Sequence, residues 1–271
     1  MLVFPNAKIN LGLNVTGTRD DGFHDIETVL FPIGFHDDLE LLPGKEEPME
    51  FKQSGLTVPG NPVDNLCLRA YHLLNKEFTI PSVKLHLKKT IPMGAGLGGG
   101  SSDAAYMIKA LNELFDLGLS PLMMMQCASR LGSDCAFFIE NKPVFATGRG
   151  DQFEALDLDL SGYAILIVVP PVHVSTAEAY QQIVVKKPAE SIRDILKSNP
   201  GEWKDRLVND FEHSVFRRHP VIRLIKERLY TAGAVYASMS GSGSAVYGLF
   251  ARELPEGISF PGFLTWTGRL S

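Results

Sequence analysis

The chain has 271 residues, of which 45% are hydrophobic, enough to build one large domain or two compact ones. Charged residues make up 21% of the chain, and the formal net charge of −5 argues against a general nucleic-acid binder, which needs a basic face. No apolar run reaches the roughly 18 residues of a membrane span, and the three cysteines form no CxxC pair, so we expect a reduced, cytoplasmic protein without membrane contact.

The first segment predicts a β-strand. Residues 9–15 alternate in the manner of a strand that buries one face, and the apolar run contains Lys8 and Asn10. No basic region precedes this run, which makes a signal peptide a poor interpretation. The turn-forming residues 16–25 follow, and two further strands are expected over 26–35 and 39–42.

A helix, a strand and two more helices are expected next. The sequence VDNLCLRAYHLLNKEF predicts a helix that begins near Asp64 or Asn65, and residues 83–91 alternate like a strand. A glycine-rich segment then leads into a periodic helix over 104–115. Ser120 and Pro121 have the residue types of a helix cap and first turn, so another helix is expected from there to Gly132.

The second half mixes strands and helices without strict alternation. The polar stretch near 150–160 is the expected boundary, which divides the chain into lobes over 1–153 and 154–271. A buried strand is expected over 163–171. The remaining expected elements are helices around 192–196, 203–216 and 221–231, and a strand, Ser/Gly turn and strand over 234–250. This order predicts an α+β fold.

The segment PMGAGLGGGSSDAA, residues 92–105, is the strongest local signal. Glycine fills five of the seven positions 94–100. The next segment is helical rather than a strand, which disfavours a Rossmann fold or a protein-kinase loop, and the GKS or GKT of a Walker motif is missing. A glycine loop that leads to Ser101 and Ser102 at a helix start suits a polyphosphate bound by backbone amides. The alternative is a flexible linker with an ordinary serine cap.

Three other positions each have a functional and a purely structural interpretation. Lys8 is either a catalytic lysine or an edge-strand lysine, and Asp134 in LGSDCAFF is either a functional carboxylate or a helix cap. The sequence SMSGSGSAV, residues 238–246, alone predicts only a turn. The seven histidines show no metal-ligand spacing such as HExxH, so we predict no zinc site built by the protein, and the metal ligands stay unknown.

Taken together, these segments resemble the kinase superfamily named for galactose, homoserine, mevalonate and phosphomevalonate kinases, the GHMP kinases. Its three signatures match in order: PNAKINLGL at 5–13, PMGAGLGGGSSDAA at 92–105 and MSGSGSAV at 239–246. The resemblance covers nearly the whole chain. It implies two α+β lobes, with ATP and substrate meeting in the cleft between them.

The resemblance also implies roles for individual residues. Lys8 and Asp134 correspond to the catalytic pair, and Asn10 is expected near the reacting alcohol. Asn65 and Lys89 are expected near the adenine of ATP, with Mg²⁺ bridging the ATP phosphates. The phosphate loop would consist of Pro92, Met93, Gly94, Ala95, Gly96, Leu97, Gly98, Gly99, Gly100, Ser101 and Ser102.

Within the superfamily, the chain is most similar to the kinases of non-mevalonate isoprenoid biosynthesis whose substrate carries a cytidyl diphosphate. Their cytosine-reading Gly-Tyr-His triplet corresponds to residues 22–24, where Phe23 replaces the usual tyrosine before His24. Thr176 and Tyr180 match positions that contact the diphosphate and close the cytosine site.

The resemblance therefore implies ATP-dependent phosphorylation of the 2-hydroxyl of this substrate by a monomer or homodimer. Alternative hypotheses are mevalonate or homoserine kinase, which would leave Phe23, His24 and Tyr180 without a role, and a non-catalytic ATP-binding protein.

Overall fold

The computed structural model describes residues 1–44, 49–181 and 183–270, and the chain folds as two units made of interleaved segments. Unit 1 comprises Met1–Ala7, His36–Met93 and Gly98–Lys142. Unit 2 comprises Lys8–Phe35, Gly94–Leu97 and Pro143–Ser271. The boundary expected at residue 153 falls inside a strand of unit 2. The expectation that ATP and substrate meet in a cleft between two lobes stays a prediction.

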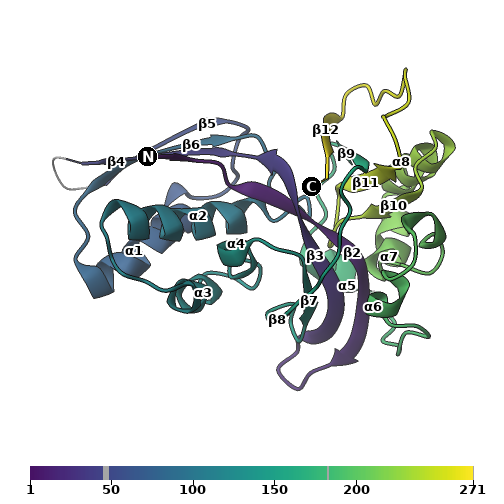
Figure 1. Ribbon diagram of the computed structural model, residues 1–271, viewed down its shortest axis with the longest axis horizontal. Coiled ribbons are helices and arrows are strands. Elements are labelled where there is room, and N and C mark those ends of the chain that lie inside the picture. The colour runs from purple at the N-terminus through teal and green to yellow at the C-terminus, as the bar shows by residue number, and fades with distance from the viewer. Residues whose placement is uncertain (45–48, 182, 271) are drawn as a thin grey trace. The chain divides into compact units, whose positions relative to one another are not determined.

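Unit 1 is a four-stranded sheet with helices on one face (Figure 1). The strand order is β1-β4-β6-β5, where β5 runs parallel to β6 and the other pairs are antiparallel. The strands are β1 (Leu2–Val3), β4 (Asp38–Pro43), β5 (Glu50–Gly55) and β6 (Val83–Lys89). The helices are η1 (Pro62–Asp64), α1 (Leu66–Phe78), α2 (Gly99–Leu114), α3 (Pro121–Ser129) and α4 (Phe137–Glu140).

Unit 2 contains two four-stranded sheets, in the orders β2-β3-β7-β8 and β10-β11-β9-β12. The first consists of β2 (Asn6–Thr18), whose first two residues belong to unit 1, β3 (His24–His36), β7 (Val144–Thr147) and β8 (Gln152–Ala155). The second consists of β9 (Ala164–Val169), β10 (Tyr236–Met239), β11 (Val246–Phe250) and β12 (Leu264–Arg269). The helices are α5 (Thr176–Tyr180), α6 (Ile192–Ile195), η2 (Pro200–Glu202), α7 (Phe211–Arg218) and α8 (Pro220–Thr231).

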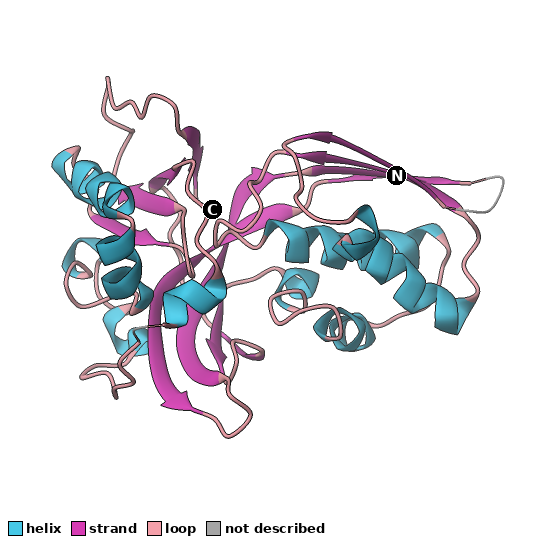
Figure 2. Cartoon of the chain, turned by 180° about the vertical axis from the view of Figure 1, so that it is seen from behind, coloured by secondary structure: helices cyan, strands magenta, loops and turns pink. Residues whose placement is uncertain are grey.

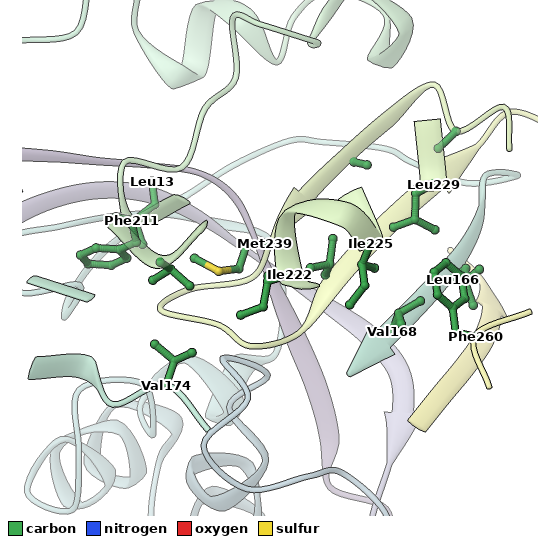
Figure 3. Packing of buried hydrophobic residues seen from close by; sticks show 14 of the residues in the cluster. Leu13, Leu166, Val168, Val174, Phe211, Ile222, Ile225, Leu229, Met239 and Phe260 are labelled. Atoms are coloured by element: carbon green, nitrogen blue, oxygen red, sulfur yellow. The ribbon is translucent and has the colours of Figure 1, made fainter. Parts of the chain in front are cut away.

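The core of unit 2 lies between the second sheet and helices α7 and α8. Every residue of β9 is buried, which explains why its sequence is continuously apolar rather than alternating. Ile222, Ile225 and Leu229 of α8 recur at helical spacing and pack with Leu166 and Val168 of β9 (Figure 3). This packing supports the strands that lead into the Ser/Gly turn.

Most expected elements are present, and helices and strands mix in both units, which confirms the α+β class (Figure 2). Asn65 caps α1, since its side chain accepts a hydrogen bond from the Cys67 N–H at 2.9 Å. Helix α2 begins at Gly99, before the expected serine pair, with Gly98 in the left-handed conformation as its cap.

The helix expected over 203–216 is wrong in its first half. Only Phe211–Arg218 is helical, because residues 208–210 pair with β2 instead. Leu13 donates its N–H to Val208 O at 2.9 Å and accepts from the Asp210 N–H at 2.8 Å. A backbone that forms a bridge with another strand cannot also form helical hydrogen bonds.

Candidate active site

The glycine loop has backbone torsions that require its glycines. Gly94, Gly96 and Gly98 have φ of 66°, 80° and 73°, in the left-handed region that disfavours residues with a Cβ. A Cβ at Gly96 would also overlap the carbonyl oxygen of Ser240. The loop is therefore a defined structure, and the interpretation as a flexible linker is wrong.

The carbonyl groups of the loop are used inside unit 2. Ala95 O accepts from the Ala245 N–H at 3.1 Å, Gly96 O from the Ser240 hydroxyl at 2.8 Å, and Leu97 O from the Lys8 N–H at 2.9 Å. By contrast, no hydrogen bond within the described part of the chain takes the backbone N–H groups of residues 94–100. These N–H groups precede and open α2, whose dipole adds positive potential. The loop can therefore bind an anion through its backbone.

All three sequence signatures meet in unit 2, around Asn10. The Asn10 N–H donates to Ser240 Oγ at 3.3 Å, and the same hydroxyl donates to Gly96 O of the glycine loop. Tyr247 donates its buried hydroxyl to Asn10 O at 2.8 Å. The turn SMSGSGSAV thus connects the first strand with the loop. The interpretation of this segment as an isolated turn missed its function as a support.

Lys8 and Asn10 form a buried polar chain along β2. Lys8 Nζ donates to Asn10 Oδ1 at 2.6 Å, and Asn10 Nδ2 donates to Thr28 Oγ1 at 3.0 Å. Thr28 in turn donates to Gly12 O at 2.5 Å. Lys8 and Asn10 are each only 4% exposed, so Lys8 is not an ordinary edge lysine with its amine in water.

Asp134 belongs to unit 1 and lies in the turn between α3 and α4, partly buried. Helix α4 has Ala136 at its cap position, two residues after Asp134. The interpretation of Asp134 as a helix cap and its interpretation as a functional carboxylate therefore both stay predictions. Its partnership with Lys8 stays a prediction.

Lys89 forms the centre of a buried ion cluster in unit 1. Its ammonium group donates to Asp37 Oδ2 and, at 2.7 Å, to Asp103 Oδ2. Asp37 Oδ1 also accepts the backbone N–H groups of Thr90 and Ile91, at 2.5 and 2.8 Å. The cluster thus connects the end of β6, the residues that precede the loop and the N-terminal part of α2.

The cluster changes the role expected for Lys89. The side chain of Lys89 is 0% exposed, so its ammonium group supports the loop from inside unit 1 and does not face solvent. Burial alone would lower the pKa of Lys89, but Asp103 and Asp37 outweigh this effect and raise it. Burial, with a further contribution from Asp37, raises the pKa of Asp103 to about 7, against the opposing effect of Lys89.

A pocket of about 130 Å³ lies beside this cluster in unit 1. Its lining includes Asn65, Leu66, Met93, Gly100 and Asp103. Asn65 was expected near a nucleotide base, and the structure places it in the same pocket as two residues of the expected phosphate loop. The pocket has apolar and polar walls, as a base requires.

The residues expected to read cytosine gather on unit 2. His24 opens β3 and stacks on Tyr180 at the end of α5, with ring centroids 4.6 Å apart and planes 22° apart. Thr176 is the first residue of the same helix. Phe23 precedes His24 in the turn and is 50% exposed, so its ring is available to a ligand and is not part of the core.

Three residues of the site were not singled out from the sequence. Asp37 lies between two strands and resembles a turn residue, and Asp103 follows the serine pair within an otherwise small and apolar helix face. A carboxylate on a buried helix face is a signal that could have suggested a buried cation as partner. Ser240 gave no such signal, because serine is common in turns.

Two family models match the chain: that of the GHMP kinases N terminal domain over residues 65–142 and that of the GHMP kinases C terminal over residues 189–257. A 4-diphosphocytidyl-2-C-methyl-D-erythritol kinase of Bacteroides thetaiotaomicron is 54% identical over 260 residues, which cover 94% of this chain and 95% of the relative. The protein of the same name from Parabacteroides distasonis is 48% identical over the full length of both chains.

Solved structures agree with these sequence relatives. A crystal structure of 4-(cytidine 5'-diphospho)-2C-methyl-D-erythritol kinase matches with a TM-score of 0.82 and 29% identity, covering 100% of this chain and 99% of that one. A mevalonate kinase structure matches over the same shares with a TM-score of 0.68 but only 14% identity, which shows a common fold alone.

Substitution of Asp37 tests the buried cluster. Asp37→Ala should lower the free energy of unfolding by about 3–5 kcal/mol, because it removes one partner of a buried ion pair and leaves two backbone N–H groups unpaired. Asp38→Ala is the control, since Asp38 pairs with Lys88 at the surface and should cost less than about 1 kcal/mol. Urea unfolding measures both. Equal costs would show that the cluster contributes no special stability.

The pKa of Asp103 predicts a pH dependence of stability. Between the ordinary aspartate value of 3.8 and about 7, the folded chain holds a proton that the unfolded chain has lost, so stability should fall as pH rises through this window and level off above it. Asp103→Asn should lack this slope. Urea unfolding of both proteins from pH 5 to 8.5 measures the difference, and a wild-type curve that rises relative to the variant would contradict a raised pKa.

Proposed function

Because the chain belongs to the GHMP kinase family, and within it to the 4-diphosphocytidyl-2-C-methyl-D-erythritol kinases, we propose that its loop, buried lysine and aromatic group bind and align the two substrates of this kinase. The protein is a small-molecule kinase. It phosphorylates the 2-hydroxyl of 4-diphosphocytidyl-2-C-methyl-D-erythritol with ATP, in isoprenoid precursor biosynthesis. The observation that carries this conclusion is the 48–54% identity to relatives of that name over more than nine-tenths of the chain.

We propose that residues 92–102 bind the phosphates of ATP. The available backbone N–H groups of residues 94–100 support this assignment, as does the N-terminus of α2. The pocket that contains Asn65 is the proposed site of the adenine. Lys89 supports the loop through Asp37 and Asp103, and it has no proposed contact with the base.

The proposed chemistry needs a base, a cation and alignment. Asp134 would take the proton of the substrate hydroxyl while the hydroxyl oxygen attacks the γ-phosphorus of ATP. ADP would leave on the side opposite to this oxygen. The ammonium group of Lys8 would stabilise the negative charge that develops on the oxygen. Asn10 Oδ1 accepts a hydrogen bond from Lys8 Nζ at 2.6 Å and so fixes the position of this ammonium group.

We also infer that Mg²⁺ accompanies ATP. The hydroxyl of Ser102, in the first turn of α2, is buried and has no hydrogen-bond partner among residues that the structure describes, so it is available to a metal or a phosphate. In the same residues, no group of three His, Cys, Asp or Glu side chains could hold an ion. Phosphates and water would therefore supply most ligands, as Mg²⁺ prefers. The bound ion would neutralise charge on the transferred phosphoryl group.

The cytidyl end of the substrate is assigned to Phe23, His24 and Tyr180, with Thr176 near the diphosphate. Support comes from the exposed ring of Phe23 and from the placement of His24 against Tyr180. An aromatic face attracts a base by stacking, whereas imidazole nitrogens can hydrogen-bond its edge. The phenol that tyrosine would supply at position 23 is absent here.

An ADP-release assay with Mg-ATP tests the substrate. Activity with the cytidyl substrate and none with mevalonate or homoserine is expected, and the reverse order would contradict the assignment.

No helix in the described ranges is long and apolar enough to cross a membrane. A cytoplasmic location, a monomeric or homodimeric state and the lack of nucleic-acid partners stay predictions.

Substitution of Asp134 tests the proposed base. Asp134→Asn should lower kcat by roughly 10²–10⁴-fold, the usual range for general acid–base catalysis, with little change in melting temperature. Asp157→Asn removes an exposed carboxylate elsewhere and should leave both quantities unchanged. An Asp134→Asn variant that turns over like the wild type would exclude the assigned role.

Substitution of Phe23 tests the base-binding group. Stacking is worth about 1–3 kcal/mol per base, so Phe23→Ala should raise KM for the cytidyl substrate roughly 5- to 150-fold, whereas Phe23→Tyr keeps the face and should be nearly neutral. KM for ATP should not change. If only the melting temperature fell, Phe23 would be a packing residue and the base would bind elsewhere.

A further inference from the structure

Arg149 lies on the ring of Phe23. The guanidinium carbon is 3.9 Å from the ring centroid, which is a close cation–π contact. Both residues belong to unit 2, and both are exposed. No sequence pattern singles out Arg149, which lies in a polar turn between β7 and β8.

The turn holds Arg149 in place. Gly148 and Gly150 on either side have φ of 65° and 84°, and the Arg149 N–H donates to Asp151 Oδ1 at 3.0 Å. Gly148 O accepts the N–H of Ile26 at 2.8 Å, which extends the pairing of β7 with β3 to within two residues of His24. The position of Arg149 beside Phe23 therefore follows from strand register.

The guanidinium of Arg149 has no carboxylate within ion-pair distance among residues 1–44, 49–181 and 183–270. Arg149 contributes to the lowered pKa of Asp21, but the Asp21 oxygens already accept from the Phe23 N–H at 3.1 Å and from Arg19 at 3.4 Å. Arg193 provides the contrast in the same unit: it also lies on a phenylalanine ring, that of Phe145 at 4.2 Å, yet both its terminal nitrogens bind Glu154.

A guanidinium that stacks through its face keeps its N–H groups in the plane, directed away from the ring. Such an unpaired fork suits phosphate oxygens, which accept charge-assisted hydrogen bonds. The substrate of this enzyme joins a base to a diphosphate, and the proposed base site is made of Phe23 and the adjacent His24–Tyr180 stack. The diphosphate of the substrate would bring such oxygens close to that site.

We propose that Arg149 is a specificity-determining residue that binds the diphosphate of the cytidyl substrate while it holds the ring of Phe23 in place. The proposal rests on the proposed function, because it places the cytidyl end at Phe23. Phe23 recognises the base, and Arg149 recognises the charge next to it. A solvated surface arginine without a ligand is the competing interpretation.

Binding of CDP and of cytidine to the intact protein, measured by calorimetry, tests this proposal. Arg149→Ala should raise the Kd of CDP roughly 10-fold, the scale of a charge-assisted hydrogen bond at a partly exposed site, and change that of cytidine less than about 2-fold. Arg193→Ala removes a similar arginine–phenyl contact and should leave both values unchanged. Added salt should weaken CDP binding more in the wild type than in Arg149→Ala.

An equal loss for cytidine and CDP would overturn the proposal, since Arg149 would then act only through Phe23. No loss for either ligand would also overturn it and leave a solvated arginine. Phe23→Ala separates these results from a failure of the proposed function, because it should weaken both ligands. If Phe23→Ala changed neither Kd, the base site itself would be misplaced.

Discussion

The ion cluster around the buried ammonium group of Lys89 is the interaction on which the start of the glycine loop and helix α2 depend. The ammonium group donates to one oxygen of each of two carboxylates, Asp37 and Asp103, and its side chain has no exposure to solvent. Asp37 then takes the backbone N–H groups of Thr90 and Ile91, which precede the loop. One cation thereby fixes the end of a strand, the beginning of the loop and the start of a helix.

Unit 2 constrains the same loop by a different means. Its contacts to residues 95–97 are neutral hydrogen bonds from the backbone of Lys8 and Ala245 and from the Ser240 hydroxyl, and all of them take carbonyl oxygens. Because these carbonyl oxygens accept hydrogen bonds within unit 2, an anion at the loop would meet N–H groups rather than free carbonyl oxygens. The electrostatic character of the loop thus follows from where its carbonyls bind, and charged side chains of the loop are not needed.

Patterns within short segments predicted much of this structure. Alternation predicted the strands around residues 9–15 and 83–91, and an asparagine before an apolar run predicted the start of α1. Failures came where a distant segment decides the outcome. Residues 208–210 pair with β2 rather than extending a helix, and the partner of Lys89, Asp37, lies 52 positions earlier in the chain. The pairing of β3 with β7 likewise brings Arg149 close to Phe23, and no pattern within a short segment predicts this contact.

The proposed recognition of phosphate by the main chain of the loop has a consequence for which substitutions the loop can accept. Because the proposed ligand groups in the loop are amide protons, every amino acid except proline supplies them, and exchange of a side chain alters only whether the backbone can keep its path. The tolerance of a loop position to substitution should therefore depend on its backbone torsion angle φ. It should be lowest at Gly94, Gly96 and Gly98, where φ is positive. An inhibitor that imitates a phosphate at this loop would bind the backbone. Few side-chain substitutions could therefore remove its contacts and make the enzyme resistant.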